Sequence, residues 1–168
     1  MNIRSETRED IEDIRRINIE AFDTDAEAHL VDALRDSGVP LISLVAEAEG
    51  DLLGHILFSP VELQSDKPRI AIAGLAPMAV LPELQNKGVG SRLIQEGLKQ
   101  CASEGYQAVV VLGHAAYYRR FGFLPASQFG IRSQYDVADE VFMILELKNG
   151  ALKGHKGIVK YHTLFNDI

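Results

Sequence analysis

Hydrophobic residues recur at helical spacing through most of the first forty positions. In a first stretch the apolar side chains share one side of a helix: Ile11, Ile14, Ile17, Ala21 and Phe22. A second stretch repeats this pattern from Ala26 to Leu34, and Gly38-Val39-Pro40 ends it. Ahead of both, residues 2–5 predict a short strand, and Thr7 with Asp10 three positions later is close to a capping box. This part of the chain therefore predicts one strand and two amphipathic helices.

The pattern then changes to that of strands. Residues 42–47 and 52–63 are apolar runs joined by Glu49-Gly50-Asp51, which predicts a hairpin. A third run extends from about Ile70 to Leu81, and a helical stripe follows it between Gly88 and Gly105. The nearly unbroken apolar run at residues 108–112 is typical of a strand buried on both faces. A strand–helix–strand order of this kind predicts two parallel strands joined by a right-handed crossover.

The last third of the chain has a weaker pattern. Residues 115–120 predict a short helix, residues 141–147 a strong strand, and residues 157–162 a short last strand. There is no repeat and no linker. With 168 residues, of which 46% are hydrophobic and 24% charged, the chain is expected to form one globular domain over residues 1–168.

Net charge and cysteine content limit the kinds of binding partner and cellular compartment that we expect. The formal net charge of −7 argues against nucleic acid, whose phosphates require clustered Lys and Arg, and weakly favours a cationic, amine-bearing substrate. The single cysteine, Cys101, excludes an internal disulfide and fits a reducing compartment. The polar start of the chain does not resemble a signal peptide, and no apolar run reaches the roughly 20 residues of a membrane helix. We therefore expect a cytoplasmic protein without a membrane partner.

The clearest candidate chemistry lies between the third apolar run and the helix after it. Pro82 ends the strand because proline has no N–H to donate, and Gly88-Val89-Gly90 opens the helix after a short polar loop. Glycines let the backbone approach a ligand closely, and a helix N-terminus presents free N–H groups with about half a positive charge. The loop therefore suits a phosphate or pyrophosphate.

Two common nucleotide-binding motifs do not fit this loop. A dinucleotide fingerprint needs a small residue in place of Leu93 and an acidic residue about 20 positions on, but residues 107–120 contain no Asp or Glu. A Walker-type loop needs a Gly-Lys-Ser or Gly-Lys-Thr triplet, which is absent. An ordinary turn remains the alternative to an anion site.

The residues Gln85-x-x-Gly88-x-Gly90 resemble the acetyl-CoA signature of the GCN5-related N-acetyltransferases (GNAT). Tyr118 to Phe123 resembles the Tyr-x-x-x-Gly-Phe ending of that family. Residues 74–80, and residues 111–114 followed by two tyrosines, are similar to a bacterial subgroup, the YhbS-like predicted acetyltransferases. The resemblance extends over most of the chain. It implies the acyl-CoA N-acyltransferase (GNAT) fold, a mixed α/β (α+β) architecture whose central mixed, twisted sheet has helices on both faces and two splayed parallel strands.

The resemblance also implies acetyl-CoA as the acetyl donor substrate. Backbone N–H groups of the loop are expected to hold the pyrophosphate, and the strand before it to offer its backbone to the pantetheine arm, as an added strand does. The strand must then splay from residues 109–112. The implied donor-binding residues are Met78, Ala79, Val80, Gln85, Lys87, Gly88, Val89, Gly90 and Ser91. The five histidines show no metal-ligand spacing, so no metal is expected.

By its position in the resemblance, Tyr118 is the expected catalytic residue, a hydrogen-bond donor or acid for the leaving thiolate; a slip of one position would exchange it with Tyr117. The phenol pKa of about 10 exceeds the thiol pKa of about 8.5, so full proton transfer is uphill by about 2 kcal/mol. The sequence does not identify the general base that takes the proton of the amine. Glu47, His55 and Glu62 are expected to be strand-face residues, and residues 73–77 carry no carboxylate. A water relay is therefore the simplest expectation. At the end of the fifth strand, a turn-stabilising role for His114 is at least as plausible as a catalytic one, and Cys101 is expected to be a buried small residue.

The expected function is transfer of the acetyl group of acetyl-CoA to a primary amine of an unidentified small-molecule or peptide acceptor, by direct attack in a ternary complex. A non-catalytic acyl-CoA-binding sensor and a nucleotide-binding module are the alternatives. Residues 22–27 and 129–137 are expected to form the acceptor pocket, where Asp23, Asp25 and Glu27 could hold a cationic amine or only cap a solvated loop. The sequence does not fix the oligomeric state, and a homodimer is one possibility.

Overall fold

The computed structural model describes residues 1–167 and divides the chain into two compact units. Unit 1 comprises residues 1–59, 76–97 and the end of the chain from Thr163, and unit 2 comprises residues 60–75 and 98–162. Three elements continue from one unit into the other: strand β3 (Asp51–Gln64), strand β4 (Ile72–Val80) and helix α3 (Val89–Ser103).

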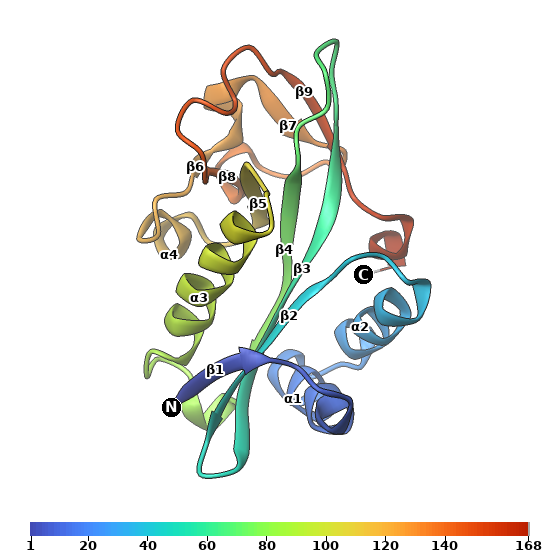
Figure 1. Ribbon diagram of the computed structural model, residues 1–168, viewed down its shortest axis with the longest axis vertical. Helices are drawn as coiled ribbons and strands as arrows, with labels where there is room; N and C mark the ends of the chain where they lie inside the picture. The colour runs from blue at the N-terminus through green and yellow to red at the C-terminus, as the bar shows by residue number, and fades with distance from the viewer. Residues whose placement is uncertain (168) are drawn as a thin grey trace. The chain divides into compact units, whose positions relative to one another are not determined.

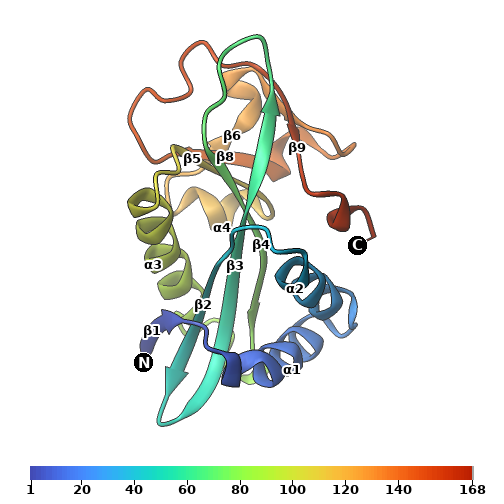
Figure 2. The same cartoon turned by 45° about the vertical axis from the view of Figure 1, so that its right-hand side comes forward.

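Unit 1 contains the N-terminal elements that the hydrophobic pattern predicted. They are β1 (Asn2–Ser5), α1 (Ile11–Phe22), α2 (Ala26–Ser37) and β2 (Ile42–Ala48). The predicted hairpin is confirmed, since β2 pairs antiparallel with β3, and β1 pairs antiparallel with β2. Figures 1 and 2 show α1 and α2 side by side on one face of these strands, with the first turns of α3 on the other. The apolar stripes face inward: Ile17 and Leu34 are fully buried.

A charged cluster caps the first helix. One 3-10 turn (Arg8–Asp10) precedes α1, and the predicted capping box is confirmed, because the Thr7 N–H donates to Asp10 Oδ2 at 2.7 Å. Arg4 donates to both Asp10 carboxylate oxygens, at 2.7 and 3.0 Å. These bonds to Arg4 are the main reason that the pKa of Asp10 falls from 3.8 to about 2.

The lowered pKa of Asp10 predicts acid-dependent stability. Its stabilisation is present above about pH 4 and is lost as the pH falls toward about 2, because the folded pKa lies below the unfolded one. Urea unfolding of the wild type and Asp10→Asn should therefore differ by about 2 kcal/mol at pH 7 and by much less at pH 2.5. Asp13→Asn, at an exposed position of α1, is the matched control. A gap that is equal at both pH values would contradict the assignment.

Unit 2 is built around β5 (Ala108–Leu112), a strand buried as predicted, with Ala108 to Val111 at most 1% exposed. The first four residues of β4 pair parallel with it, from Ile72↔Ala108 to Leu75↔Val111, which confirms the predicted parallel pair. Strand β8 (Phe142–Glu146) pairs antiparallel with the other edge of β5. The predicted short helix is α4 (Ala115–Arg119). The third apolar run becomes a strand at Ile72, where its pairing with β5 begins, and not at Ile70 as predicted.

Two short strands in unit 2 have no counterpart in the sequence prediction. These are β6 (Leu124–Pro125), paired with β8, and β7 (Ile131–Ser133), paired parallel with β9 (Gly157–Lys160). With two and three residues they are too short for an alternating pattern to be visible. The predicted last strand is confirmed but ends at Lys160, where its pairing with Glu62 of β3 also ends.

The strands together form a mixed sheet. Pairing follows the order β1-β2-β3-β4-β5-β8-β6, and β9 pairs with β3 and β7. The pairs β4–β5 and β7–β9 are parallel, whereas β1–β2, β2–β3 and β5–β8 are antiparallel, as expected for the mixed α/β fold that the resemblance implied. Within residues 1–167, no helix has both the length and the apolar composition to cross a membrane.

Candidate functional site

The polar loop after β4 is held in an open conformation. The Gln85 side-chain amide donates to the Val80 carbonyl at 3.1 Å, which ties the loop to the end of the strand. Asn86 and Gly88 both have positive φ, at 64° and 90°. A Cβ at Gly88 would have no atom within 4 Å, so the backbone conformation, and not crowding, explains glycine there. The loop from Gln85 to Gly88 is exposed to solvent.

Helix α3 begins directly after this loop. Its first hydrogen bond joins the Arg92 N–H to the Gly88 carbonyl at 3.1 Å. The N–H groups of Val89 and Gly90 precede this bond and have no acceptor within the helix. The exposed Lys87 lies two residues before Val89. These donors, the positive end of the helix dipole and one cation form an arrangement that binds phosphate oxygens.

The end of β4 is free of β5 along one edge. Pairing with β5 stops at Leu75, whereas β4 continues for five residues, through Ala76, cis-Pro77, Met78 and Ala79 to Val80. Ala76 and Met78 are half-buried, whereas Ala79 is 2% exposed. Backbone groups on this edge have no strand partner in β5. Such an edge accepts an extended chain that carries amides, as in β-augmentation.

Gly54 of β3 supports the same site, although sequence reasoning did not select it. A Cβ there would lie 3.0 Å from the Ala79 carbonyl oxygen and 3.1 Å from side-chain atoms of Val89 and Leu93. The absence of a side chain lets the first turns of α3 pack closely on β3 and β4. A glycine inside an otherwise apolar strand was the available signal, because such glycines mark close backbone approach.

Tyr118 lies on α4 in unit 2. Its ring packs edge-on against Tyr117 and Phe123, with centroids 5.1 and 5.7 Å away, and lies so close to Gly113 that a Cβ there would be 2.4 Å from the ring. The residue is 8% exposed, and burial raises the pKa of Tyr118 to about 12. Its hydroxyl makes no hydrogen bond within residues 1–167. The phenol is therefore protonated and keeps a donor available.

The three strand residues considered as bases are each engaged. Glu47 accepts from Arg4 at 3.1 Å, and Glu62 accepts from Arg69 at 3.1 Å. His55 is fully buried, and burial lowers its pKa to about 3, so its ring is neutral. Each of the three is paired or buried, which agrees with their expected role as strand-face residues.

His55 belongs to a buried polar chain in unit 1. The Asn18 amide nitrogen donates to the Ile14 carbonyl at 3.0 Å and lies 3.3 Å from His55 Nδ1, so Nδ1 is the acceptor. The ring proton is then on Nε2, which donates to Ser43 Oγ at 2.9 Å. Ser43 in turn donates to Glu6, which pairs with Arg35. This arrangement fastens α1 and α2 to β2 and β3.

His114 and Cys101, the other candidates from the sequence, have structural roles. The His114 carbonyl accepts from the Tyr117 and Tyr118 N–H groups, both at 3.1 Å, so this residue starts α4 through its backbone. Cys101 is fully buried, and burial raises its thiol pKa to about 12, as befits a packed small residue and not a nucleophile. Among residues 1–167, no group of three His, Cys, Asp or Glu side chains could hold a metal ion.

The acidic segment between α1 and α2 contains one unusual group. Asp23, with φ of 56°, ends α1, and Asp25 lies 3.8 Å from His29 on the next turn. Asp23 and Asp25 occupy the C-cap position of α1 and the N-cap position of α2, although the Asp25 side chain makes no capping hydrogen bond. Glu27 differs: its Oε1 atom is buried and has no hydrogen-bond partner among the described residues. A buried carboxylate oxygen without a donor is costly and suits a ligand that brings one.

The family of acetyltransferase (GNAT) domains matches residues 2–126. The chain is 38% identical over 167 residues to YhbS, an uncharacterized N-acetyltransferase of Escherichia coli K12, and the match covers 99% of both proteins. It is 41% identical over 136 residues to YjhQ of the same strain, covering 79% of this chain and 75% of YjhQ.

Two solved structures agree with these matches. The structure of YhbS from Escherichia coli in complex with CoA has a TM-score of 0.92 and 37% identity, and the match covers 98% of this chain and 91% of that one. A GNAT family acetyltransferase from Brucella melitensis in complex with acetyl-CoA has a TM-score of 0.80 and 36% identity, and the match covers 98% and 97% of the two chains. The chain therefore belongs to the GNAT family of N-acetyltransferases and is an acetyl-CoA-dependent acyltransferase.

Proposed function

We propose that this protein transfers the acetyl group of acetyl-CoA to a primary amine by direct attack in a ternary complex, with residues 1–168 acting as one N-acetyltransferase domain. The observation that carries the proposal is the combination of free N–H groups at Val89 and Gly90 with the end of β4 that does not pair with β5. The N–H groups suit a pyrophosphate, and the end of β4 suits an extended arm with amides; these are the two recognisable parts of CoA.

The donor is held by the residues that the resemblance implied. Lys87 and the backbone of Gly88, Val89, Gly90 and Ser91 bind the pyrophosphate, and Gln85 keeps the loop in place by its bond to the end of β4. The backbone of Met78, Ala79 and Val80 pairs with the pantetheine amides. The thioester carbonyl then lies along the strand end, where a backbone N–H near Val80 stabilises the oxyanion of the tetrahedral intermediate.

In the chemical step the neutral amine nitrogen forms a bond to the thioester carbon, and the carbon–sulfur bond then breaks. Tyr118 donates a hydrogen bond to the departing thiolate. With the pKa of Tyr118 at about 12, transfer of its proton to a thiolate of pKa about 8.5 is uphill by about 5 kcal/mol, so donation and not transfer is its role. The amine proton leaves through water, because Glu47, His55 and Glu62 are all engaged.

Glu27 is the proposed contact for the cationic acceptor. Its unpartnered Oε1 atom would receive a hydrogen bond from the ammonium group before deprotonation. Glu27→Gln should raise KM for cationic amines about tenfold, because it removes the charge-assisted bond, and should leave the affinity for acetyl-CoA unchanged. Asp25→Asn, a neighbouring exposed change, should leave KM within about twofold. Equal effects of both variants would assign Glu27 to the capping loop.

The proposed function is tested by release of CoA thiol from acetyl-CoA against a panel of primary amines, with mass detection of the acetylated product. Buried Cys101, whose thiol pKa is raised to about 12, should contribute little background to thiol detection in the folded protein. Turnover with at least one amine, together with saturable acetyl-CoA binding, is the expected result. Binding of acetyl-CoA without turnover of any amine would instead identify an acyl-CoA sensor, and lack of binding would overturn both.

A further inference from the structure

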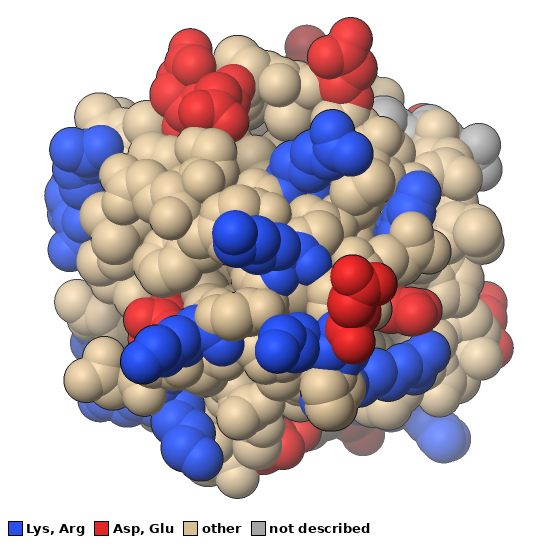
Figure 3. Space-filling model, turned by 90° about the horizontal axis from the view of Figure 1, so that it is seen from above, with Lys and Arg blue, Asp and Glu red and all other residues tan. Residues whose placement is uncertain are grey.

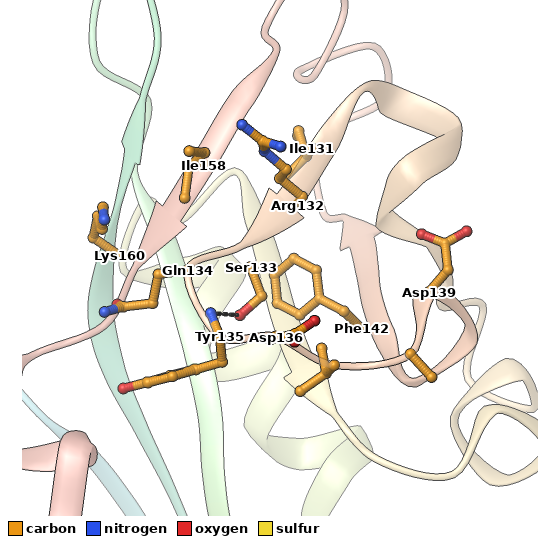
Figure 4. A pocket seen from close by; sticks show the side chains of 12 residues that line it. Ile131, Arg132, Ser133, Gln134, Tyr135, Asp136, Asp139, Phe142, Ile158 and Lys160 are labelled. Carbon is orange, nitrogen blue, oxygen red and sulfur yellow. Dashed lines mark hydrogen bonds between the residues drawn. The ribbon is translucent and has the colours of Figure 1, made fainter.

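Unit 2 contains a pocket that the acetyl donor does not explain. It has a volume of about 390 Å³ and lies between strands β7 and β9 and the segment that joins β7 to β8. Figure 4 shows Arg132 on β7, Ile158 and Lys160 on β9, and the ring of Phe142 at the centre of the view. The pocket falls in the weakly patterned region around residues 129–137.

The strands and the residue after β7 contribute hydrogen-bond donors to the lining of the pocket. Arg132 and Lys160 supply two cations, and their side chains make no ion pair within residues 1–167. Gln134 uses its carbonyl oxygen to accept from the Tyr161 N–H at 2.5 Å, so its NH₂ group is left to donate. Ser133 accepts from the Tyr135 N–H at 3.0 Å, and its hydroxyl proton is likewise available. Four donors of this kind match the oxygens of a carboxylate.

The segment after β7 supplies the opposite charge. Asp136 and Asp139 line the pocket from this segment. Asp139 accepts from the Ser127 hydroxyl at 2.8 Å, whereas the carboxylate of Asp136 has no hydrogen bond or ion pair within the described chain. Cations from the strands and a free acid from the segment therefore line one pocket without neutralising each other by contact. An ammonium group is the natural partner for Asp136.

The charge of the surrounding surface selects between kinds of ligand. Unit 2 has ten Lys and Arg against seven Asp and Glu, whereas unit 1 has seven against seventeen. Figure 3, a view from above relative to Figure 1, shows more Lys and Arg than Asp and Glu side chains on a largely uncharged surface. Such a surface attracts anions. The acids within the pocket oppose a phosphate or polyanion, so a single carboxylate accompanied by an ammonium group fits best.

We propose that this pocket binds an amino-carboxylate, such as a free amino acid or a compound with an amino-acid end. Arg132 and Lys160, with Ser133 and Gln134, hold the carboxylate, and Asp136 holds the ammonium group. Phe142, Ile158 and Val137 supply apolar contact for a side chain. A role of this ligand as acetyl acceptor rests on the proposed function, but its binding does not.

Three probes of similar size separate the two charges: leucine, leucinamide without the carboxylate, and N-acetylleucine without the ammonium group. Calorimetry or NMR titration of the full chain, with and without acetyl-CoA, should show binding of leucine and at least tenfold weaker binding of each single-charge probe. Inorganic phosphate, as the anion alone, should bind more weakly than leucine. No binding of leucine, or tighter binding of phosphate, would overturn the proposal.

Two variants assign the contacts. Arg132→Gln should weaken the binding of leucine about tenfold, so that leucine no longer binds more tightly than leucinamide. Asp136→Asn should likewise remove the difference in affinity between leucine and N-acetylleucine. Lys148→Gln and Asp66→Asn make the same charge changes at exposed positions of unit 2 outside the pocket and should leave all three affinities unchanged. If the pocket and control variants changed the affinities equally, the effect would come from the overall charge of the protein, and the proposed site would be refuted. Thiol release measured separately shows whether the bound ligand is also acetylated.

Discussion

Replacing Tyr118 by phenylalanine is expected to lower kcat about 100-fold or more while the Kd for acetyl-CoA stays unchanged. The hydroxyl is the proposed donor to the leaving thiolate, a bond that exists only as the carbon–sulfur bond breaks, and groups of this kind contribute typically 10²–10⁴-fold. Stability should hardly change, because the hydroxyl makes no hydrogen bond within residues 1–167 and the ring contacts with Gly113 and Phe123 are kept. Steady-state kinetics with the best amine, calorimetry with acetyl-CoA and thermal unfolding measure the three quantities.

Tyr117→Phe is the matched control for this experiment. Tyr117 adjoins Tyr118 on α4, makes the same kind of edge-on ring contact and is more exposed. Its replacement should change kcat by less than about threefold. If Tyr117→Phe inactivates and Tyr118→Phe does not, the donor is the neighbouring residue. If neither changes kcat, thiolate departure depends on water. Because the pKa of Tyr118 is raised to about 12, wild-type activity should show no loss from tyrosine deprotonation up to pH 10.

Gly88→Ala should weaken acetyl-CoA binding at least tenfold. The φ of Gly88 is 90°, a conformation that costs an L-residue about 1–2 kcal/mol, so the loop is expected to relax and turn its N–H groups away from the pyrophosphate. The loss should appear in Kd and in KM for acetyl-CoA, with a smaller change in kcat. Calorimetry with CoA and with acetyl-CoA should give the same ratio, since the loop contacts the part that both share.

Gly105→Ala separates this loss from backbone strain. Gly105 follows the other end of α3, has a φ of 93° and, like Gly88, would place a Cβ in open space. Both variants should therefore lose similar unfolding free energy, but only Gly88→Ala should lose acetyl-CoA affinity. A similar loss of affinity in both would mean that the effect reports general destabilisation and that the loop is not the pyrophosphate site.

Local features of the donor site could be predicted from the sequence because their physics is local. Gly88 and Gly90 at a strand-to-helix turn predict an anion-binding helix start from local sequence alone. The buried β5 and the capping box of Thr7 and Asp10 were predicted for the same reason, since each follows from residues a few positions apart, whereas the parallel pairing of β4 with β5 follows from the strand–helix–strand order. Short strands such as β6 and β7 were not, because two or three residues carry no periodicity.

Features of the site that depend on distant residues required the fold. Gly54 matters because β3, β4 and α3 meet there, and the sequence shows only a glycine in an apolar strand. The buried oxygen of Glu27 and the raised pKa of Tyr118 depend on packing that no spacing reveals. The same holds for the pocket around Arg132 and Asp136, which joins residues from β7, β9 and the segment before β8.

By itself, the sequence determined the family of this protein and predicted its donor half, namely the glycine loop and the strand before it. In the proposed site, acetyl-CoA is recognised largely by backbone groups in one continuous stretch, from Met78 to Ser91, and such a stretch can be read in order along the chain. Only the tertiary structure decided which ionisable groups are engaged, such as His55 and Glu47, and which are free, such as Glu27 and Asp136. Burial and pairing set the chemistry of a side chain, and both depend on residues that are brought together only when the chain folds.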